Sequence, residues 1–166
     1  MEMSNRQTGE ERNEFCLRFP ARTENESLAR VAAAAFAAQC DPLLDEMEDL
    51  KTAVSEAVTN AIIHGYAGQE GEVRLSGVRY GQVLTLTVED DGCGIADVAE
   101  AMRPFFTTRQ DQERSGLGFT VMETFTDSVS VESGVGKGTR VILTKKLKNA
   151  GGAADDADGR GSGRLE

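Results

Sequence analysis

The sequence predicts an α/β (α+β) two-layer sandwich, with helices on one face of a mostly antiparallel mixed sheet. Some segments of strand length alternate apolar and polar residues, whereas longer segments repeat apolar residues at helical spacing. Along the chain these segments follow as a strand, two helices, two strands, a helix and two strands. Elements in this order pack most simply as one helical layer on one sheet.

The chain begins its regular structure with a strand and a helix. An apolar alternation over residues 15–19 predicts a strand that ends at Pro20. The following helix is predicted to start from a cap at Thr23 or Asn25 and to run to about Gln39, through an alanine-rich stretch of high helix propensity.

The second helix has a strong start signal. Asp41 is a favourable N-cap residue and Pro42 suits the first helical position, so the helix is predicted to begin there and to end near Gly65. The remaining elements are predicted from the same kinds of signal: strands over residues 72–80 and 82–90, a short helix over 97–102, a mobile loop over 105–115, a helix over 116–125, and a hairpin of strands over 128–132 and 139–147.

Both ends of the chain lack this periodicity. Residues 1–12 are polar and are predicted to be a disordered leader, and residues 149–166 form a Gly/Ala/Asp-rich low-complexity tail that is also predicted to be disordered. A single domain is therefore expected over residues 13–148, without internal repeats.

Composition excludes several classes of protein. A formal net charge of −10 disfavours direct binding to nucleic acid, whose phosphates would be repelled. No apolar run approaches the roughly 20 residues of a membrane-spanning helix. The three cysteines show no metal-ligand spacing and cannot all pair, which favours a reduced, cytoplasmic protein.

The second helix carries a polar ridge at the border of its apolar stripe. Glu56, Asn60 and His64 are spaced four apart, so they lie on one side of the helix. A carboxylate, an amide and an imidazole at the margin of a core need partners there. From this helix alone, a hydrogen-bonded helix flank and a functional site are both open interpretations.

Two glycine-bearing segments can bind ligands through their backbones. Asp90 ends a predicted strand and can accept a hydrogen bond from an exocyclic amine such as that of adenine, while Gly92 and Gly94 allow close approach of a flat ligand. Gly116 and Gly118 open a helix, whose free N–H groups can bind an anion. Each segment alone is also compatible with an ordinary turn.

A third glycine-rich segment, residues 134–139, superficially resembles a phosphate-binding loop. It does not match a Walker A motif, because Val131 stands where a glycine is needed and a strand follows where a helix is needed. We therefore interpret it as a hairpin turn.

In order and spacing, the three motifs together resemble the GHKL ATPases over about residues 13–146. The motifs are Glu56-x-x-x-Asn60-x-x-x-His64, Asp90-x-Gly92-x-Gly94 and Gly116-x-Gly118. In detail, residues 21–27, 55–66, 106–108 and 113–119 are similar to the sporulation anti-sigma factors of this family, which are also serine kinases. The resemblance implies a Bergerat-type ATP-binding fold.

The resemblance also implies roles for individual residues. Glu56 would be the general base, Asn60 would ligate Mg²⁺ on the ATP phosphates, and His64 would support the site. The other implied ATP/ADP contacts are Asp90, Gly92 and Gly94 with Thr139 for the adenine, and Thr107, Thr108, Arg114, Gly116 and Gly118 for the lid and the phosphates.

The implied function is partner switching controlled by ATP and ADP. The chain would bind and inhibit a sporulation sigma factor, phosphorylate a serine of an anti-anti-sigma factor, form a homodimer and contact a partner through Arg30. A related stress-response kinase and a nucleotide-responsive sigma-binding module with little kinase activity are the alternatives. The catalytic domain of a sensor histidine kinase is disfavoured, because the only histidine, His64, lies inside the implied ATP site.

Overall fold

The computed structural model describes residues 11–104, 117–149 and 151. These residues form one sheet with strands β1 (Arg12–Pro20), β2 (Glu72–Tyr80), β3 (Val83–Asp90), β4 (Ser128–Ser133) and β5 (Thr139–Lys146). The strand order is β1-β2-β3-β5-β4, and each of these neighbouring pairs is antiparallel. The sheet therefore has β3 at its centre, with Asp90 at the end of that central strand.

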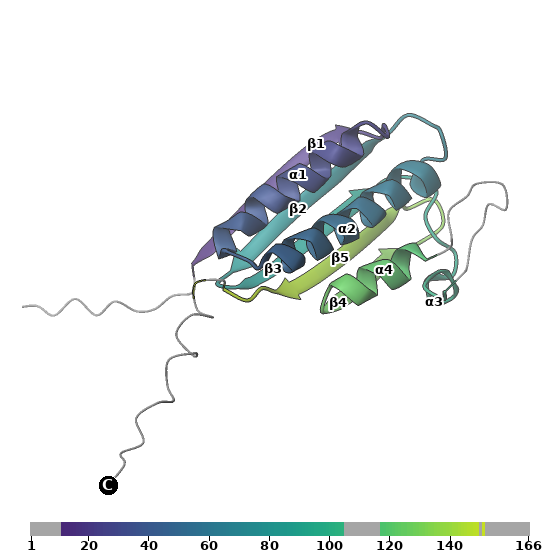
Figure 1. Ribbon diagram of the computed structural model, residues 1–166. Coiled ribbons are helices and arrows are strands. Elements are labelled where there is room, and N and C mark those ends of the chain that lie inside the picture. Colours follow the sequence, from purple (N-terminus) through teal and green to yellow (C-terminus); the bar gives the residue numbers. More distant parts are fainter. Residues whose placement is uncertain (1–10, 105–116, 150, 152–166) are drawn as a thin grey trace, which may run out of the picture.

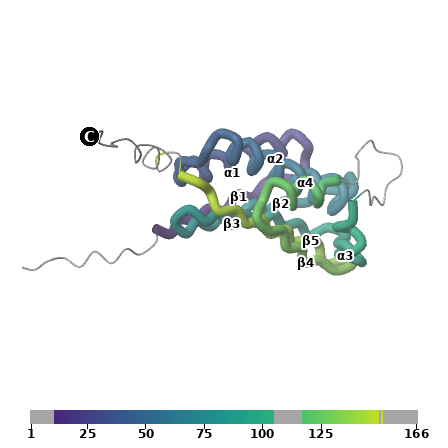
Figure 2. The backbone as a smooth tube through the Cα atoms, turned by 60° about the horizontal axis from the view of Figure 1, so that its bottom comes forward, coloured from purple at the N-terminus to yellow at the C-terminus, as the bar shows by residue number. Residues whose placement is uncertain are grey.

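The helices in the described part of the chain are α1 (Asn25–Ala37), α2 (Leu44–Asn60), α3 (Val98–Ala101) and α4 (Gly118–Phe125). A 3₁₀ turn (Ala38–Cys40) extends α1, and a π-helical turn (Ala61–Gly65) extends α2. α1 lies over β1 and β2, α2 over β3, and α4 over β4 (Figure 1). Turned by 60°, the molecule shows these helices as one layer and the sheet as the other (Figure 2). The predicted two-layer fold is confirmed.

The core lies between the two layers. In α1 and α2 the buried residues recur three and four positions apart, which gives each helix an apolar stripe. In the strands they alternate, as in β2, where Val73 and Leu75 are fully buried. Small residues such as Ala33 and Ala57 lie in this interface, so the helices pack closely on each other and on the sheet.

The predicted start of the second helix is wrong by two residues. α2 begins at Leu44, while Asp41 adopts a left-handed conformation with φ 48° and Pro42 forms an isolated bridge with Asn149. The helix start is instead stabilised by Glu46, whose Oε2 accepts the Leu43 N–H at 3.2 Å. Glu46 also accepts the N–H of a residue far along the chain, Lys148, at 3.1 Å, so a tertiary contact decides where the helix begins.

The ordered domain extends slightly beyond its expected limits. β1 begins at Arg12, within the predicted leader, because strand pairing uses backbone groups and the Arg12 side chain donates to the Tyr80 hydroxyl at 2.9 Å. The bridge from Pro42 reaches Asn149, the first residue of the predicted tail. The rest of the leader to residue 10, residues 152–166 of the tail and the predicted loop over 105–115 lie outside the described residues.

α4 starts at Gly118, close to its predicted start, and α3 occupies the predicted short helix with Asp97 as its cap. The Asp97 side chain accepts the Glu100 N–H at 2.9 Å. In the part of the chain that the structure describes, no helix has the length and apolar character to cross a membrane.

Candidate functional site

The polar ridge of α2 meets the start of α4 at Gly118. A Cβ added to Gly118 would lie 3.2 Å from Glu56 Oε2, 3.2 Å from Asn60 Nδ2 and 3.4 Å from Asn60 Oδ1. The backbone of α4 therefore approaches a carboxylate and an amide so closely that an added Cβ would be tight against both side chains. Two motifs that are far apart in the sequence come together here.

The ridge continues into an irregular turn. Beyond Asn60 the helix widens into a π-helical turn, closed by a hydrogen bond from the Tyr66 N–H to the Ala61 carbonyl at 3.2 Å. Such turns are rare and occur frequently at functional sites. His64 lies in this turn and is half-buried, and its carbonyl accepts the thiol of Cys93 at 3.2 Å.

Asp90 is a buried carboxylate pressed against the end of this turn. Its residue is 5% exposed, and a Cβ on Gly65 would lie 2.7 Å from Asp90 Oδ1. Burial raises the pKa of Asp90, while hydrogen bonds from the backbone of Gly92 and Thr139 act in the opposite direction. The Gly92 N–H reaches Oδ1 at 2.9 Å. These contacts hold the carboxylate in one orientation, in which it can accept a hydrogen bond from a ligand.

The loop after Asp90 is held by backbone contacts on both sides. The Cys93 N–H donates to the Gly65 carbonyl at 2.8 Å, and a Cβ on Gly92 would lie 2.1 Å from that same oxygen. Gly94 has φ 71°, and a Cβ there would lie 1.9 Å from the Gly134 carbonyl oxygen. The two motif glycines are therefore required by the close approach of neighbouring backbones.

The hairpin turn over residues 134–138 takes part in this packing. It joins β4 to β5 as predicted, and its Gly136 N–H donates to the Cys93 carbonyl at 2.8 Å. Thr139, at the start of β5, pairs with Asp90 across the strands. Its hydroxyl lies 2.9 Å from that of Ser133, which also accepts the Ile95 N–H at 2.8 Å.

Ser133 was missed by the sequence reasoning. A serine at the end of a short strand carries no distinctive local pattern, and only the pairing of β4 with β5 brings it to the loop. Tyr66 was not among the predicted site residues either. Its hydroxyl accepts the N–H of Asp91, which is distant in sequence, at 2.9 Å.

A pocket of about 280 Å³ opens on the other side of Glu56, between the start of α1 and α2. It is lined by Thr23, Glu26, Ser55, Glu56, Thr59, Ile62 and Ile63. The Ser55 hydroxyl donates to Glu26 Oε1 at 2.5 Å, which joins the two helices beside the pocket. Glu56 thus lies between this pocket and the start of α4.

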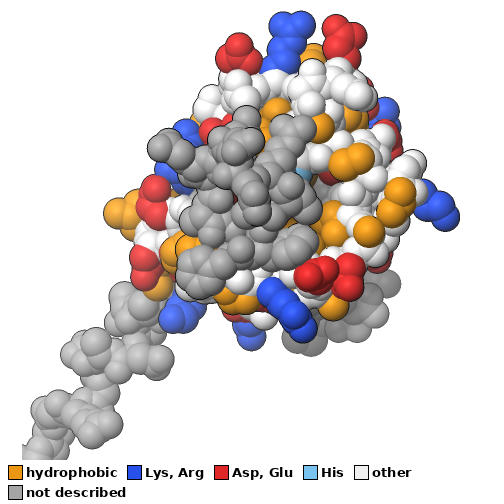
Figure 3. Space-filling view, turned by 90° about the vertical axis from the view of Figure 1, so that its right-hand side faces the viewer, with side chains coloured by type: hydrophobic (Ala, Val, Ile, Leu, Met, Phe, Trp, Pro, Cys, Tyr) orange, Lys and Arg blue, Asp and Glu red, His pale blue; other side chains and the backbone are white. Residues whose placement is uncertain are grey.

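Figure 3 looks onto the end of the molecule where α2 finishes. Among the described atoms visible in this view, charged side chains lie mainly around the rim.

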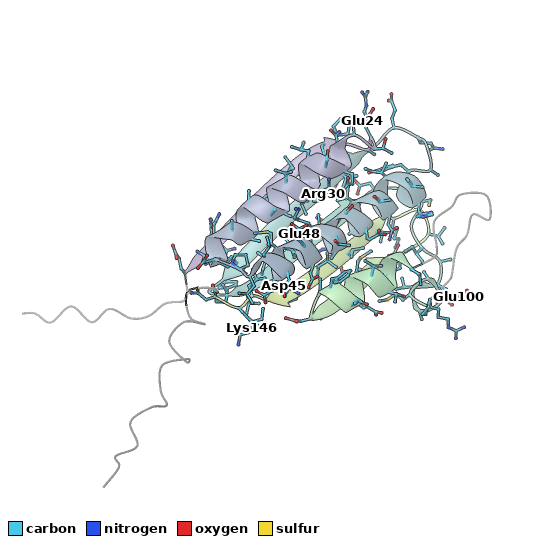
Figure 4. The ribbon with its side chains drawn as sticks, viewed as in Figure 1. Glu24, Arg30, Asp45, Glu48, Glu100 and Lys146 are labelled. Carbon is cyan, nitrogen blue, oxygen red and sulfur yellow. The ribbon has the colours of Figure 1, made fainter. Side chains whose placement is uncertain are left out.

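Arg30 lies on α1, one helical turn beyond Glu26, which lines the pocket between α1 and α2 (Figure 4). Its side chain is 41% exposed and forms a long ion pair with Glu26, at 3.9 Å. Leu28 and Val31 are exposed on the same helix, at 49% and 61%.

Four residues of the predicted site lie outside the described residues: Thr107, Thr108, Arg114 and Gly116. Within the described ranges, no group of three His, Cys, Asp or Glu side chains is arranged to hold a metal ion. Mg²⁺ that is bound mainly through phosphates needs only one or two hard oxygen ligands from the protein. The Asn60 amide, which lies beside Gly118, fits that requirement.

Comparisons with known proteins identify the family of the chain. A family model described as a histidine kinase-like ATPase domain matches residues 19–145. The anti-sigma F factor of Clostridium novyi is 54% identical over 138 residues, which cover 82% of this chain and 96% of that protein. The anti-sigma F factor of Geobacillus stearothermophilus is 58% identical over 135 residues, which cover 81% of this chain and 92% of that protein.

A crystal structure of RsbU and RsbW domains from Mycobacterium tuberculosis shares the fold. Its TM-score is 0.59 at 20% identity, and the match covers 81% of this chain and 32% of the solved chain. At this identity the likeness concerns the fold alone.

Proposed function

This chain belongs to the family of histidine kinase-like ATPase domains that includes the anti-sigma F factors, and from this premise we propose that it is an ATP-dependent anti-sigma factor of sporulation. In this proposal it binds and inhibits a sigma factor, and it transfers a phosphoryl group from ATP to a serine of an anti-anti-sigma factor. The nucleotide state selects the partner. A cytoplasmic location and a homodimer are parts of the same proposal.

The contact of Gly118 with Glu56 and Asn60 carries the kinase proposal. Phosphoryl transfer depends mainly on positioning and charge neutralisation, with one residue that orients the nucleophile. Backbone N–H groups at the start of α4 suit phosphate oxygens, and they lie beside the Asn60 amide, a suitable Mg²⁺ ligand. Mg²⁺, when bound, neutralises charge on the phosphates.

Glu56 is the proposed general base. Its carboxylate lies near Gly118 and also lines the pocket between α1 and α2, so a serine hydroxyl can reach it from solvent. Glu56 takes the hydroxyl proton while the serine oxygen bonds to the γ-phosphorus, and the bond to the departing ADP breaks. Thr107, Thr108, Arg114 and Gly116 complete the lid and phosphate contacts in this proposal.

Adenine recognition is assigned to Asp90. Its buried, oriented carboxylate supports this role, because it can accept from the exocyclic amine. Gly92 and Gly94 let the loop after Asp90 pack against the backbones of Gly65 and Gly134, so that the loop can border the base. Thr139 assists from β5, and His64 supports the site from the end of α2.

The kinase is tested with radiolabelled ATP and the anti-anti-sigma protein. Glu56→Ala should lower the rate of labelling of the partner serine by about 10²-fold or more, with ATP affinity little changed. Glu48→Ala is the matched control, because Glu48 lies on the same helix and pairs with Lys51 on the surface at 2.8 Å. Transfer by Glu56→Ala at a near wild-type rate would remove Glu56 from the base role.

A sigma-binding module with little kinase activity is the second candidate. The exposed apolar side chains of Leu28 and Val31, which lie on the same helix as Arg30, favour a protein-binding surface on α1. Arg30→Glu should weaken sigma-factor binding at least about tenfold, whereas Lys146→Glu, the same charge change on β5 (Figure 4), should not. Sigma binding without any labelling of the partner serine would favour this candidate over the kinase.

A further inference from the structure

Tyr66 connects the end of α2 to the strand end that carries Asp90. Its residue is 9% exposed, and its hydroxyl donates to the Glu72 carbonyl and accepts the Asp91 N–H, at 2.5 Å and 2.9 Å. Both the donor and an acceptor position of the hydroxyl are therefore used. One side chain bridges the start of β2 and the residue that follows β3.

Asp91 is fixed through its backbone and through its side chain. Tyr66 binds its N–H, and Arg74 binds both carboxylate oxygens, at 2.7 Å and 3.1 Å. The peptide that joins Asp90 to Asp91 consequently cannot rotate without breaking the hydrogen bond to Tyr66. The Asp90 carboxylate accepts the N–H of Gly92, which belongs to the next peptide. Asp91 joins these two peptides, so holding its N–H and its side chain also restrains the donor that orients Asp90.

The tyrosine ring is itself held in place. A Cβ on Gly71 would lie 2.1 Å from Tyr66 Cε1, so the ring rests directly on the Gly71 backbone. The ring cannot shift toward Gly71, and the hydroxyl stays between its two backbone partners.

We infer that Tyr66 is a positioning residue for nucleotide selection: its hydroxyl fixes the Asp90–Asp91 peptide so that Asp90 faces the exocyclic amine of adenine. The inference rests on the proposed function, in which Asp90 holds the adenine. A hypoxanthine base presents a carbonyl oxygen where adenine has its amine, and two acceptors repel each other. A well-oriented Asp90 therefore selects ATP over ITP, and a loosened Asp90 selects less well.

The test is the ratio of the ITP and ATP dissociation constants, measured by calorimetry. Tyr66→Phe keeps the ring and removes both hydrogen bonds. We expect ATP affinity to fall about fivefold with ITP affinity nearly unchanged, so the ratio falls by about fivefold. A purely structural role of Tyr66 would change both affinities alike or neither.

Tyr80→Phe is the matched control, since Tyr80 is the only other tyrosine and its hydroxyl accepts from Arg12 at 2.9 Å. Its ATP and ITP affinities should equal those of the wild type. Gly71→Ala provides a second perturbation, because the added Cβ displaces the Tyr66 ring, and it should lower the same ratio. Thermal unfolding of each variant verifies that it folds.

An unchanged ratio in Tyr66→Phe and Gly71→Ala overturns the inference, provided that Asp90→Asn abolishes the preference for ATP. If the wild type binds ATP and ITP equally, the adenine assignment of Asp90 fails and the positioning role fails with it. If Asp90→Asn keeps the preference while Tyr66→Phe loses it, the adenine assignment fails, and Tyr66 must act on another contact, which also overturns the inference.

Discussion

A charged side chain is buried at each of the two ends of the β2–β3 strand pair, and the two side chains are held differently. At one end Asp90 is surrounded by backbone of Gly65, Gly92 and Gly138, with hydrogen bonds directed at its carboxylate. At the other end Arg79 is almost buried, with its side chain 9% exposed, and pairs with the exposed Glu11 at 3.1 Å. Among the described side chains, Arg79 Nε is the one buried polar atom that has no hydrogen-bond partner.

This difference indicates which of the two buried charges is suited to bind a ligand. The glycines at the Asp90 end let several backbones converge, so the carboxylate is oriented by groups that cannot easily move. The Arg79 end has an incompletely paired guanidinium, which pairs with an exposed carboxylate and donates to the Gly81 carbonyl at 3.5 Å. A buried charge with such partners adds little net stability. We therefore expect changes at the Asp90 end to affect stability or nucleotide binding strongly, and changes at the Arg79 end to affect neither strongly.

The largest effect is expected from Gly138→Ala. Gly138 has φ 74°, and an added Cβ would lie 1.9 Å from the Asp90 carbonyl oxygen, so the strand pair must open. The free energy of unfolding should fall by about 3 kcal/mol or more, as measured by urea denaturation. Gly136→Ala is the control: its φ is 72°, but nothing lies within 4 Å of the added Cβ. It should lose only about 1 kcal/mol, and equal losses would show that crowding at Gly138 is unimportant.

The second-largest effect is expected from Asp90→Asn, and it concerns ATP binding rather than the stability of the fold. An amide can present a donor where adenine requires an acceptor, so ATP affinity should fall by about 10–100-fold in calorimetry. The carboxylate is already costly to bury, so the free energy of unfolding should hold or rise. Unchanged ATP affinity would contradict the adenine assignment.

Arg79→Met should have a smaller effect. Methionine fills a similar space and removes the unpaired Nε together with the pair to Glu11. The free energy of unfolding should change by less than about 1 kcal/mol, and ATP affinity should not change. A loss of several kcal/mol would mean that this buried charge also supports the fold, and the contrast between the two ends would disappear.

The smallest effect is a difference in pH dependence between adjacent carboxylates. Burial raises the pKa of Asp90, so the folded state holds its proton more tightly than the unfolded state does. Stability from this group therefore falls as pH rises from the ordinary aspartate value to the raised one. Arg74 lowers the pKa of Asp91, so the stability from Asp91 is present above the ordinary value and is lost as pH falls through the lowered one.

Denaturation curves measured across this acidic range test the two signs. Asp90→Asn should remove a decline of stability with rising pH, and Asp91→Asn should remove a rise at lower pH. Asp91 is mostly exposed, so its contribution should be the weaker of the two. For each variant, the slope of unfolding free energy against pH is compared with that of the wild type. Changes of slope with the same sign in both variants would contradict the assignment of burial as the cause at Asp90.

Periodicity, together with proline, glycine and capping signals, predicted the order of elements, the two-layer fold and the hairpin around Gly136. Strands such as β2 alternate and each long helix has an apolar stripe, so local pattern and tertiary burial agree there. The start of α2 was not predictable in this way, because Glu46 is held by Lys148 from the far end of the chain. The strongest local signal for a helix start, Asp41-Pro42, therefore does not mark the first residue of α2.

The candidate site divides in the same way. The sequence by itself determined which residue types are available, namely Glu56, Asn60 and Asp90 with glycines at suitable spacing. Only the tertiary structure decided that Gly118 lies on the α2 ridge and that Tyr66 binds Asp91. The physical reason is that a glycine allows a close approach without specifying what approaches. The partner is selected by the packing of helices and strands that are distant in sequence.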